Sequence, residues 1–134
     1  MKSLKINVIT PNFTKSFEDV SLLNINTVGG ELTILPEHYP LISSFDATKV
    51  IIKKNKDKIL AFAGDGLLNV KENEIILICS AFTLKDDIDI ERAKKSLERA
   101  ENRLNSNDPS IDKARANLSK KRALLRIKIS EEKA

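Results

Sequence analysis

The hydrophobic pattern of this chain changes its period once, near residue 84, and that change limits the folds open to it. Before it, apolar residues alternate with polar ones or form short runs between turn residues, as in Leu4, Ile6 and Val8. Both patterns are typical of β-strands, and their spacing of roughly 8 to 12 residues predicts an all-β sandwich or barrel over residues 1–84. The continuous apolar run Ile75–Cys79 predicts a central strand.

The rest of the chain has a helical pattern. Between Ile88 and Lys133 it has no glycine, and Pro109 is its only proline there. Apolar residues recur at intervals of three, four and seven on both sides of the polar stretch 105–108, as on one face of a helix. Two helices joined by a short polar turn predict an antiparallel hairpin over residues 85–134. The fold class is therefore expected to be α+β, with an all-β module followed by a helical hairpin.

Candidate caps and packing stripes can be read from the hairpin segment. Asp87 or Asp89 can cap the first helix, and Asp108 followed by Pro109 predicts the start of the second. The predicted stripes consist of Ile90, Ala93, Leu97, Ala100 and Leu104 on the first helix, and of Ile111, Ala114, Leu118, Leu125 and Ile129 on the second. Several of these side chains are small and bury little apolar area. We therefore predict a hairpin that docks weakly and can leave its docking site.

Composition narrows the class of protein. The chain has 134 residues, of which 41% are hydrophobic and only 4% aromatic, so its core must consist of Ile, Leu, Val and Ala. No apolar stretch approaches the roughly 20 residues that span a bilayer, and we predict a soluble protein with no signal peptide or transmembrane helix. The single cysteine, Cys79, cannot form an internal disulfide, which fits a reducing compartment.

The charge is unevenly distributed. Lys/Arg and Asp/Glu residues balance through Leu84, nine against nine, whereas from Lys85 onward fourteen basic residues face ten acidic ones. A charge step of this kind suggests two modules with different partners. Catalytic motifs are missing: His38 is the only histidine, and the sequence contains no phosphate-binding loop motif. A standalone enzyme is therefore not expected.

The arginines of the hairpin segment repeat one spacing. They stand at i, i+7 and i+11 in both predicted helices: Arg92, Arg99 and Arg103, then Arg115, Arg122 and Arg126. Because each residue turns a helix by about 100°, Arg122 is predicted to lie within the apolar stripe of the second helix. One interpretation is a pair of solvated faces whose arginine stems cover apolar surface. The other is an anion site, most simply for a phosphate chain. Asp89 near these arginines could hold one of them in place or accept a hydrogen bond from an amine or hydroxyl of a ligand.

A family resemblance bears on this choice. Residues Gly30–Leu41 read Gly-Glu-Leu-Thr-Ile-Leu-Pro-Glu-His-Tyr-Pro-Leu. This string resembles the Gly-Glu-Leu-Gly-Ile-Leu-Pro-Gly-His-x-Pro-Leu segment of the epsilon subunit of F-type ATP synthases, with Thr33 and Glu37 in place of glycines. The segment Ile88-Asp89-Ile90-Glu91-Arg92-Ala93 is similar to the family's Ile/Leu-Asp-x-x-Arg-Ala motif. The resemblance implies a β-sandwich, residues 1–84, followed by an antiparallel α-helical hairpin, residues 85–134.

The resemblance also implies a regulatory ligand, ATP, and no required cofactor. Its nucleotide-binding residues would be Ile88, Asp89, Arg92, Ala93, Arg99, Arg122 and Arg126. Some ATP-binding members carry a glutamate five residues before the isoleucine, where this chain has Thr83. That departure leaves the strength of an ATP site in this chain open.

As the resemblance further implies, the protein is a non-catalytic subunit of the proton-translocating ATP synthase, peripheral at the cytoplasmic face of the cell membrane. Its sandwich would grip the gamma subunit and rest on the c-subunit ring, with Glu31 and His38 at this interface. Its hairpin would either fold down or extend toward the alpha/beta catalytic hexamer and block ATP hydrolysis.

A nucleic-acid-binding adaptor that uses the basic hairpin is the alternative function. It would need a phosphate affinity that falls steeply with salt. The acidic residues interleaved with the basic ones, and the lack of aromatic residues for stacking on bases, argue against it.

Overall fold

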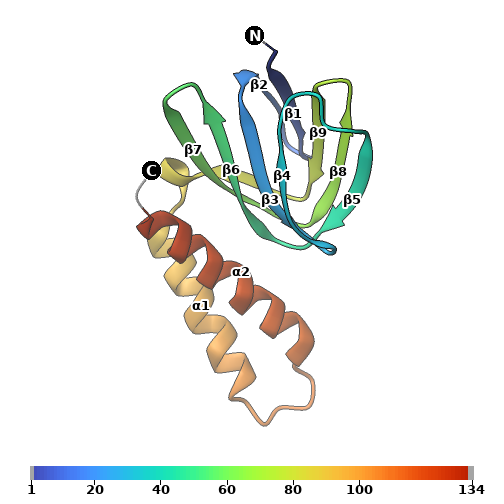
Figure 1. The fold of residues 1–134 in the computed structure, drawn as a ribbon. Coiled ribbons are helices and arrows are strands. Elements are labelled where there is room, and N and C mark those ends of the chain that lie inside the picture. The colour runs from blue at the N-terminus through green and yellow to red at the C-terminus, as the bar shows by residue number, and fades with distance from the viewer. Residues whose placement is uncertain (1, 133–134) are drawn as a thin grey trace. The chain divides into compact units, whose positions relative to one another are not determined.

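The computed structural model describes residues 2–132. The chain divides into two compact units, with the boundary between Lys85 and Asp86. The first is a β-sandwich and the second a pair of helices, so the predicted α+β fold class is confirmed (Figure 1).

The sandwich consists of two five-stranded sheets that face each other (Figure 1). One sheet has the order β2-β1-β9-β8-β5 and the other the order β10-β7-β6-β3-β4. Their bounds are β1 Leu4–Ile9, β2 Thr14–Val20, β3 Leu22–Thr27, β4 Gly30–Ile34, β5 Leu41–Phe45, β6 Thr48–Lys54, β7 Asp57–Ala63, β8 Gly66–Lys71, β9 Glu74–Cys79 and β10 Phe82–Leu84. Most neighbouring strands are antiparallel, whereas β1 and β9 run parallel.

The core of the sandwich follows the alternation seen in the sequence. Leu4, Ile6 and Val8 of β1 are buried, as the period-two pattern predicts. The apolar run Ile75–Cys79 forms β9, which lies in the middle of its sheet, so the prediction of a central strand is confirmed. Its side chains still alternate, because Ile75, Leu77 and Cys79 are in the core whereas Ile78 is 49% exposed.

A short 3-10 helix, Lys85–Asp87, spans the boundary between the units, and the second unit continues with α1, Ile90–Leu104, and α2, Lys113–Glu131. Asp89 caps α1, since its carboxylate accepts the Arg92 backbone N–H at 3.0 Å. This confirms one of the two predicted caps.

The predicted start of the second helix is wrong. Asp112 is the N-cap of α2, and its carboxylate accepts the Arg115 backbone N–H at 3.1 Å. Asp108 instead accepts from the backbone N–H and hydroxyl of Ser110, at 2.9 and 2.8 Å, and so forms a local turn. Lys113 Nζ donates to the carbonyls of Leu104 and Ser106, at 2.7 and 2.6 Å, which satisfies acceptors at the end of α1.

The predicted stripe on the second helix is wrong in part. Ala114 and Leu118 are exposed, whereas Ala116 and Ala123 are buried. Ala116 lies two residues after Ala114, which is about 200° of rotation around the helix, whereas the predicted Ile129 is buried. On α1 the prediction holds at Ala93 and Ala100, which are buried, but Ile90 is 41% exposed. Each helix thus presents a pair of alanines seven residues apart, and small side chains at that spacing let two helices approach closely.

Candidate anion site in the helical hairpin

A cavity of about 260 Å³ opens between α1 and α2. It is lined by residues of both helices: Ser96, Arg99, Ala100, Arg103, Ser119, Arg122 and Arg126. The structure thus brings the two arginine sets of the sequence analysis together. Among the lining residues within the described part of the hairpin there is no carboxylate. The cavity is therefore a concentration of positive charge with hydroxyl groups beside it.

The geometry of this cavity follows from the alanine pairs. Ser96 and Ser119 stand three residues after Ala93 and Ala116, so they lie on the faces by which the helices pack. Small residues at these positions leave room, and the long arginine side chains border it. Sequence reasoning did not name the serines, and it placed Arg103 in the arginine set without counting it among the nucleotide-binding residues. The helical spacing of Ser96 from Ala93, a predicted stripe residue, could have found Ser96, whereas the burial of Ala116 beside Ser119 was not predicted.

The charges within the site act on one another. Burial lowers the pKa of the Arg126 guanidinium from its ordinary value, and the positive charges of Arg122 and Arg92 lower it further. Arg92 therefore lies close enough to contribute to the same positive field. Arg99 is oriented by a hydrogen bond from its Nη2 to Ser96 Oγ, at 3.3 Å. An anion in the cavity would offset the repulsion between these guanidinium groups.

A second hollow of about 530 Å³ lies along α1 and shares Arg99 with the cavity. Asp89 and Arg92 line it, together with Glu91, Lys95, Glu98 and Asn102. The other two residues predicted for nucleotide binding, Ile88 and Ala93, are buried, and neither is among the residues that line these two hollows. The seven predicted residues are thus distributed: three line the arginine cavity, two line the neighbouring hollow beside Arg99, and two are packing residues.

The predicted interface residues lie on the sandwich. Glu31 is exposed on β4, where its Oε1 accepts from Asn24 Nδ2 at 3.0 Å. His38 follows β4 in the loop between Pro36 and Pro40. Its ring stacks on Tyr39 with 4.6 Å between the ring centroids, and its Nδ1 lies 2.8 Å from the Tyr39 carbonyl oxygen. Tyr39 is 74% exposed, so this stacked pair presents an aromatic surface to solvent.

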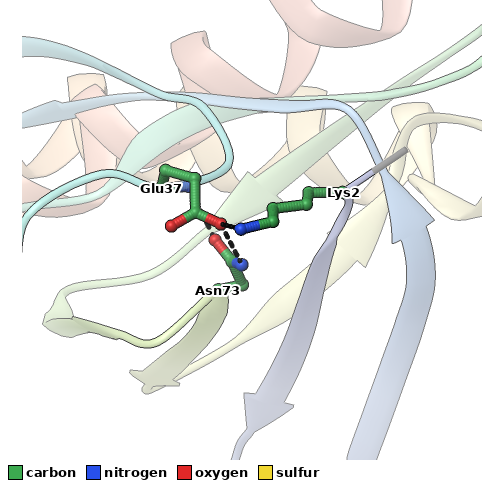
Figure 2. A network of polar contacts seen from close by, with 3 residues as sticks. All are labelled: Lys2, Glu37 and Asn73. Carbon is green, nitrogen blue, oxygen red and sulfur yellow. Dashed lines mark hydrogen bonds and ion pairs between the residues drawn. The ribbon is translucent and has the colours of Figure 1, made fainter.

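A polar network anchors the same loop and was not found from the sequence (Figure 2). Lys2 Nζ lies 2.8 Å from Glu37 Oε1, and Asn73 of the β8–β9 turn bonds to Glu37 as well. The hydrogen bond and charge of Lys2 and the hydrogen bond of Asn73 lower the pKa of the Glu37 carboxyl. The same partner raises the pKa of Lys2. No local pattern relates residues 2, 37 and 73, because only the fold brings them together.

Within residues 2–132, neither helix combines the length and the apolar character needed to cross a membrane. The same residues contain no group of three or more His, Cys, Asp or Glu side chains that could hold a metal ion.

Comparison with known families covers almost the whole chain. Residues 3–85 match the beta-sandwich domain of the ATP synthase delta/epsilon chain, and residues 86–131 match the long alpha-helix domain of the same chain. The boundary between the two matches coincides with the boundary between the two structural units.

Relatives that match over nearly their full length are ATP synthase epsilon chains. An ATP synthase epsilon chain of Halalkalibacterium halodurans is 37% identical over 131 residues, which cover 97% of this chain and 98% of the relative. One from Clostridium kluyveri is 36% identical over 129 residues, covering 94% of this chain and 96% of the relative.

Two solved assemblies contain chains of similar fold. One is the Euglena gracilis mitochondrial ATP synthase, OSCP/F1/c-ring, with a TM-score of 0.73 and 16% identity, covering 87% of this chain and 74% of that one. The other is the central stalk/c-ring of the Tetrahymena thermophila mitochondrial ATP synthase, with a TM-score of 0.64 and 14% identity, covering 96% and 97%. Both domain matches and the full-length relatives show that the chain belongs to the ATP synthase delta/epsilon family, as an epsilon chain.

Proposed function

We propose that this chain works in the central stalk of a bacterial F-type ATP synthase, where it helps couple rotation of the gamma subunit to the proton-driven c ring. The family match supports membership of the complex, and the titles of two structures of similar fold name a c-ring, one of them with the central stalk. In this role the sandwich binds gamma and rests on the c ring through Glu31 and the His38 loop. The chain is peripheral, at the cytoplasmic face of the membrane, and non-catalytic.

The hairpin is the regulatory element of this proposal. When α1 and α2 extend toward the alpha/beta hexamer, they inhibit ATP hydrolysis; when they pack together, they bind ATP and inhibition is relieved. One observation carries this part: the arginine cavity is lined from both helices, so it exists only while they lie side by side. A ligand of that cavity favours the packed hairpin by its difference in affinity between the two states. A coupling of about 1–3 kcal/mol is typical of such switches.

The predicted residues divide into three roles. Arg99, Arg122 and Arg126 contact the phosphates, because they line the cavity. Arg92 adds to the positive field, as its effect on Arg126 indicates. Ile88, Asp89 and Ala93 fix the start of α1, since two of them are buried and Asp89 holds the Arg92 backbone N–H.

Calorimetric titration of the purified chain with ATP tests the nucleotide part. Changing Arg122 and Arg126 together to Ala should weaken binding about tenfold or more, because a hydrogen bond to a charged group contributes about 1.5–3 kcal/mol. Arg115→Ala is the matched control: it removes an arginine of the same helix that is not among the residues lining the cavity. Unchanged affinity in the double variant would contradict the assignment.

A separate experiment tests the stalk part. The chain should co-purify with the gamma subunit, and a chain ending at Leu84 should still do so, because the sandwich keeps all ten described strands. An ATPase assembled with the shortened chain should hydrolyse ATP faster than one with the full chain. Equal rates would contradict inhibition by the hairpin, and loss of gamma binding would contradict a stalk contact through the sandwich. The nucleic-acid adaptor of the sequence analysis gains no support from the family matches.

A further inference from the structure

The two helices of the hairpin are bonded to each other at the turn by one side chain. Lys113, the first residue of α2, donates from its Nζ to the carbonyl oxygens of Leu104 and Ser106, at 2.7 and 2.6 Å. Leu104 is the last residue of α1, where carbonyl oxygens have no partner within the helix. We call these two hydrogen bonds the Lys113 bridge. It joins the start of α2 to the end of α1 across the turn at residues 105–112 (Figure 1).

The Lys113 bridge reaches farther along the chain than the other side-chain bonds of the turn. The Ser106 hydroxyl accepts the Asp108 backbone N–H, and the Asp108 carboxylate accepts from Ser110, so these bonds join residues two positions apart. Such local bonds do not depend on the direction in which α2 leaves the turn. The bonds of Lys113 span seven and nine residues and do depend on it. They form only while the start of α2 lies beside the end of α1.

The position of this lysine is unfavourable for α2 considered alone. A positive charge in the first turn of a helix opposes the helix dipole, whereas the same charge near the last carbonyls of a helix is favourable. Although Asp112 caps α2, its first turn contains no acidic residue and includes both Lys113 and Arg115. The interaction that compensates for the charge of Lys113 therefore lies at the end of α1. This placement stabilises the packed hairpin rather than the second helix.

The rest of the interface between the helices is weak enough for such a contact to matter. Its small buried residues contribute little apolar area: Ala93, Ala100, Ala116 and Ala123. Burial, and then the positive charges of Arg122 and Arg92, lower the pKa of the Arg126 guanidinium, so these groups repel one another. Without an anion this repulsion opposes packing of the helices. A contact of modest strength at the turn therefore shifts the balance between packed and separated helices.

We propose that Lys113 holds the hairpin in its packed state in the absence of a ligand, through two hydrogen bonds that are lost when the helices separate. This inference rests on the proposed function, because it names a residue that sets the balance between the two states of the same hairpin. The balance is then set at the turn as well as in the cavity. Loss of the Lys113 bridge favours the separated helices and therefore the inhibitory state.

The test measures the opening of the helix interface with a thiol probe in the full chain. Ala123→Cys places the thiol at a position that is 1% exposed, on the face of α2 that also contains Ser119 and Arg126. Cys79→Ala removes the native thiol. An uncharged dipyridyl disulfide then modifies the probe in proportion to the fraction of chains with separated helices, when opening and closing are faster than modification.

In this parent chain, Lys113→Met should raise the modification rate about three- to tenfold, because the net contribution of one hydrogen bond corresponds to a factor of about that size. Circular dichroism should show no loss of helix. Methionine is about as good a helix former as lysine, and it removes a charge that opposes the dipole of α2. A role of Lys113 in the stability of α2 alone would instead lower the helical signal.

Two further variants provide the controls. Lys113→Arg keeps a donating cation and should return the modification rate to within about twofold of the parent. Lys121→Met removes an exposed lysine of α2 that makes no hydrogen bond or ion pair within residues 2–132, and it should leave the rate unchanged. If fast modification of the parent shows that Ala123→Cys disturbs the interface, Ala100→Cys on α1 is the second probe, because Ala100 is 2% exposed.

Two outcomes would overturn the inference. The first is a modification rate that Lys113→Met does not raise, because the Lys113 bridge then does not hold the helices together. The second is a raised rate accompanied by a loss of helical signal, because Lys113 then supports α2 itself. Neither outcome affects the proposed function, since other contacts can set the balance of the hairpin.

An activity measurement distinguishes failure of the proposed function. An ATPase assembled with Lys113→Met should hydrolyse ATP more slowly than one with the wild-type chain, because a larger fraction of its hairpins is separated. If the thiol probe shows opening and the rate of hydrolysis is unchanged, the Lys113 bridge is supported and inhibition by the separated hairpin is wrong.

Discussion

Glu37 and Asn73 are joined by two hydrogen bonds that run in opposite directions (Figure 2). The Glu37 backbone N–H donates to Asn73 Oδ1 at 2.6 Å, and Asn73 Nδ2 donates to Glu37 Oε1 at 3.2 Å. Both residues have a left-handed backbone, with φ of 67° and 62°. Asparagine tolerates this conformation well and glutamate does not. The pair, with Lys2, therefore explains how a glutamate stands at a position where the resembled family segment has glycine.

Asn73→Ala should destabilise the sandwich by about 1–2 kcal/mol. It removes both hydrogen bonds to Glu37 and places an alanine at positive φ. Glu37→Gly is the matched comparison, because it relieves the positive φ and keeps the backbone N–H that donates to Asn73. We expect its effect on the free energy of unfolding to be the smaller of the two. Urea unfolding measures both, and a larger loss for Glu37→Gly would contradict this account of the loop.

The Lys2–Glu37 pair predicts a dependence of stability on pH. The pKa of Glu37 is lower in the folded chain than its ordinary value of 4.5, chiefly because of the hydrogen bond from Lys2. A carboxyl group with a lowered folded pKa stabilises the fold above its unfolded pKa, and this contribution is lost as the pH falls through the folded pKa. Wild type should therefore exceed Glu37→Gln in stability near pH 6, and the difference should shrink toward pH 3. Unfolding at both pH values measures it; a constant difference would argue against the pair.

The cap of α2 provides a test of the hairpin. Asp112→Ala should cost about 1 kcal/mol of stability, within the usual range of about 0.5–2 kcal/mol for loss of an N-cap. Asp108→Ala, four residues earlier, should cost less, because Asp108 only bonds to Ser110 within the turn. Thermal unfolding followed by the helical circular dichroism signal measures both. A larger effect at Asp108 would restore the start of the helix that the sequence predicts.

Cys79 should be unreactive in the folded chain. Its side chain is in the sandwich core, and burial is the main reason that its pKa rises to about 11. Because the thiolate is the nucleophile, a disulfide reagent at pH 8 should modify the native protein very slowly and the urea-unfolded protein quickly. Rapid modification of the native chain would show that this end of β9 opens locally.

The sequence was sufficient where the signal is local. The alternation in Leu4, Ile6 and Val8 predicted a buried strand face, and the change of period predicted the helices after it. Asp89 could be proposed as a cap because capping depends on residues three positions apart. The repeated spacing of the arginines allowed an anion site as one of two interpretations, and Arg99, Arg122 and Arg126 line one cavity.

Tertiary structure decided what depends on a partner distant in sequence. The buried face of α2 contains Ala116 and Ala123 rather than Ala114 and Leu118. Both faces offer apolar side chains, so the hydrophobic pattern of the helix alone does not choose between them, and the packing of α2 against α1 does. Likewise, Glu37 keeps a strained backbone only because the fold brings Asn73 and Lys2 beside it. Local sequence therefore determined the elements and their charges, whereas the long-range contacts determined which faces and loops became sites.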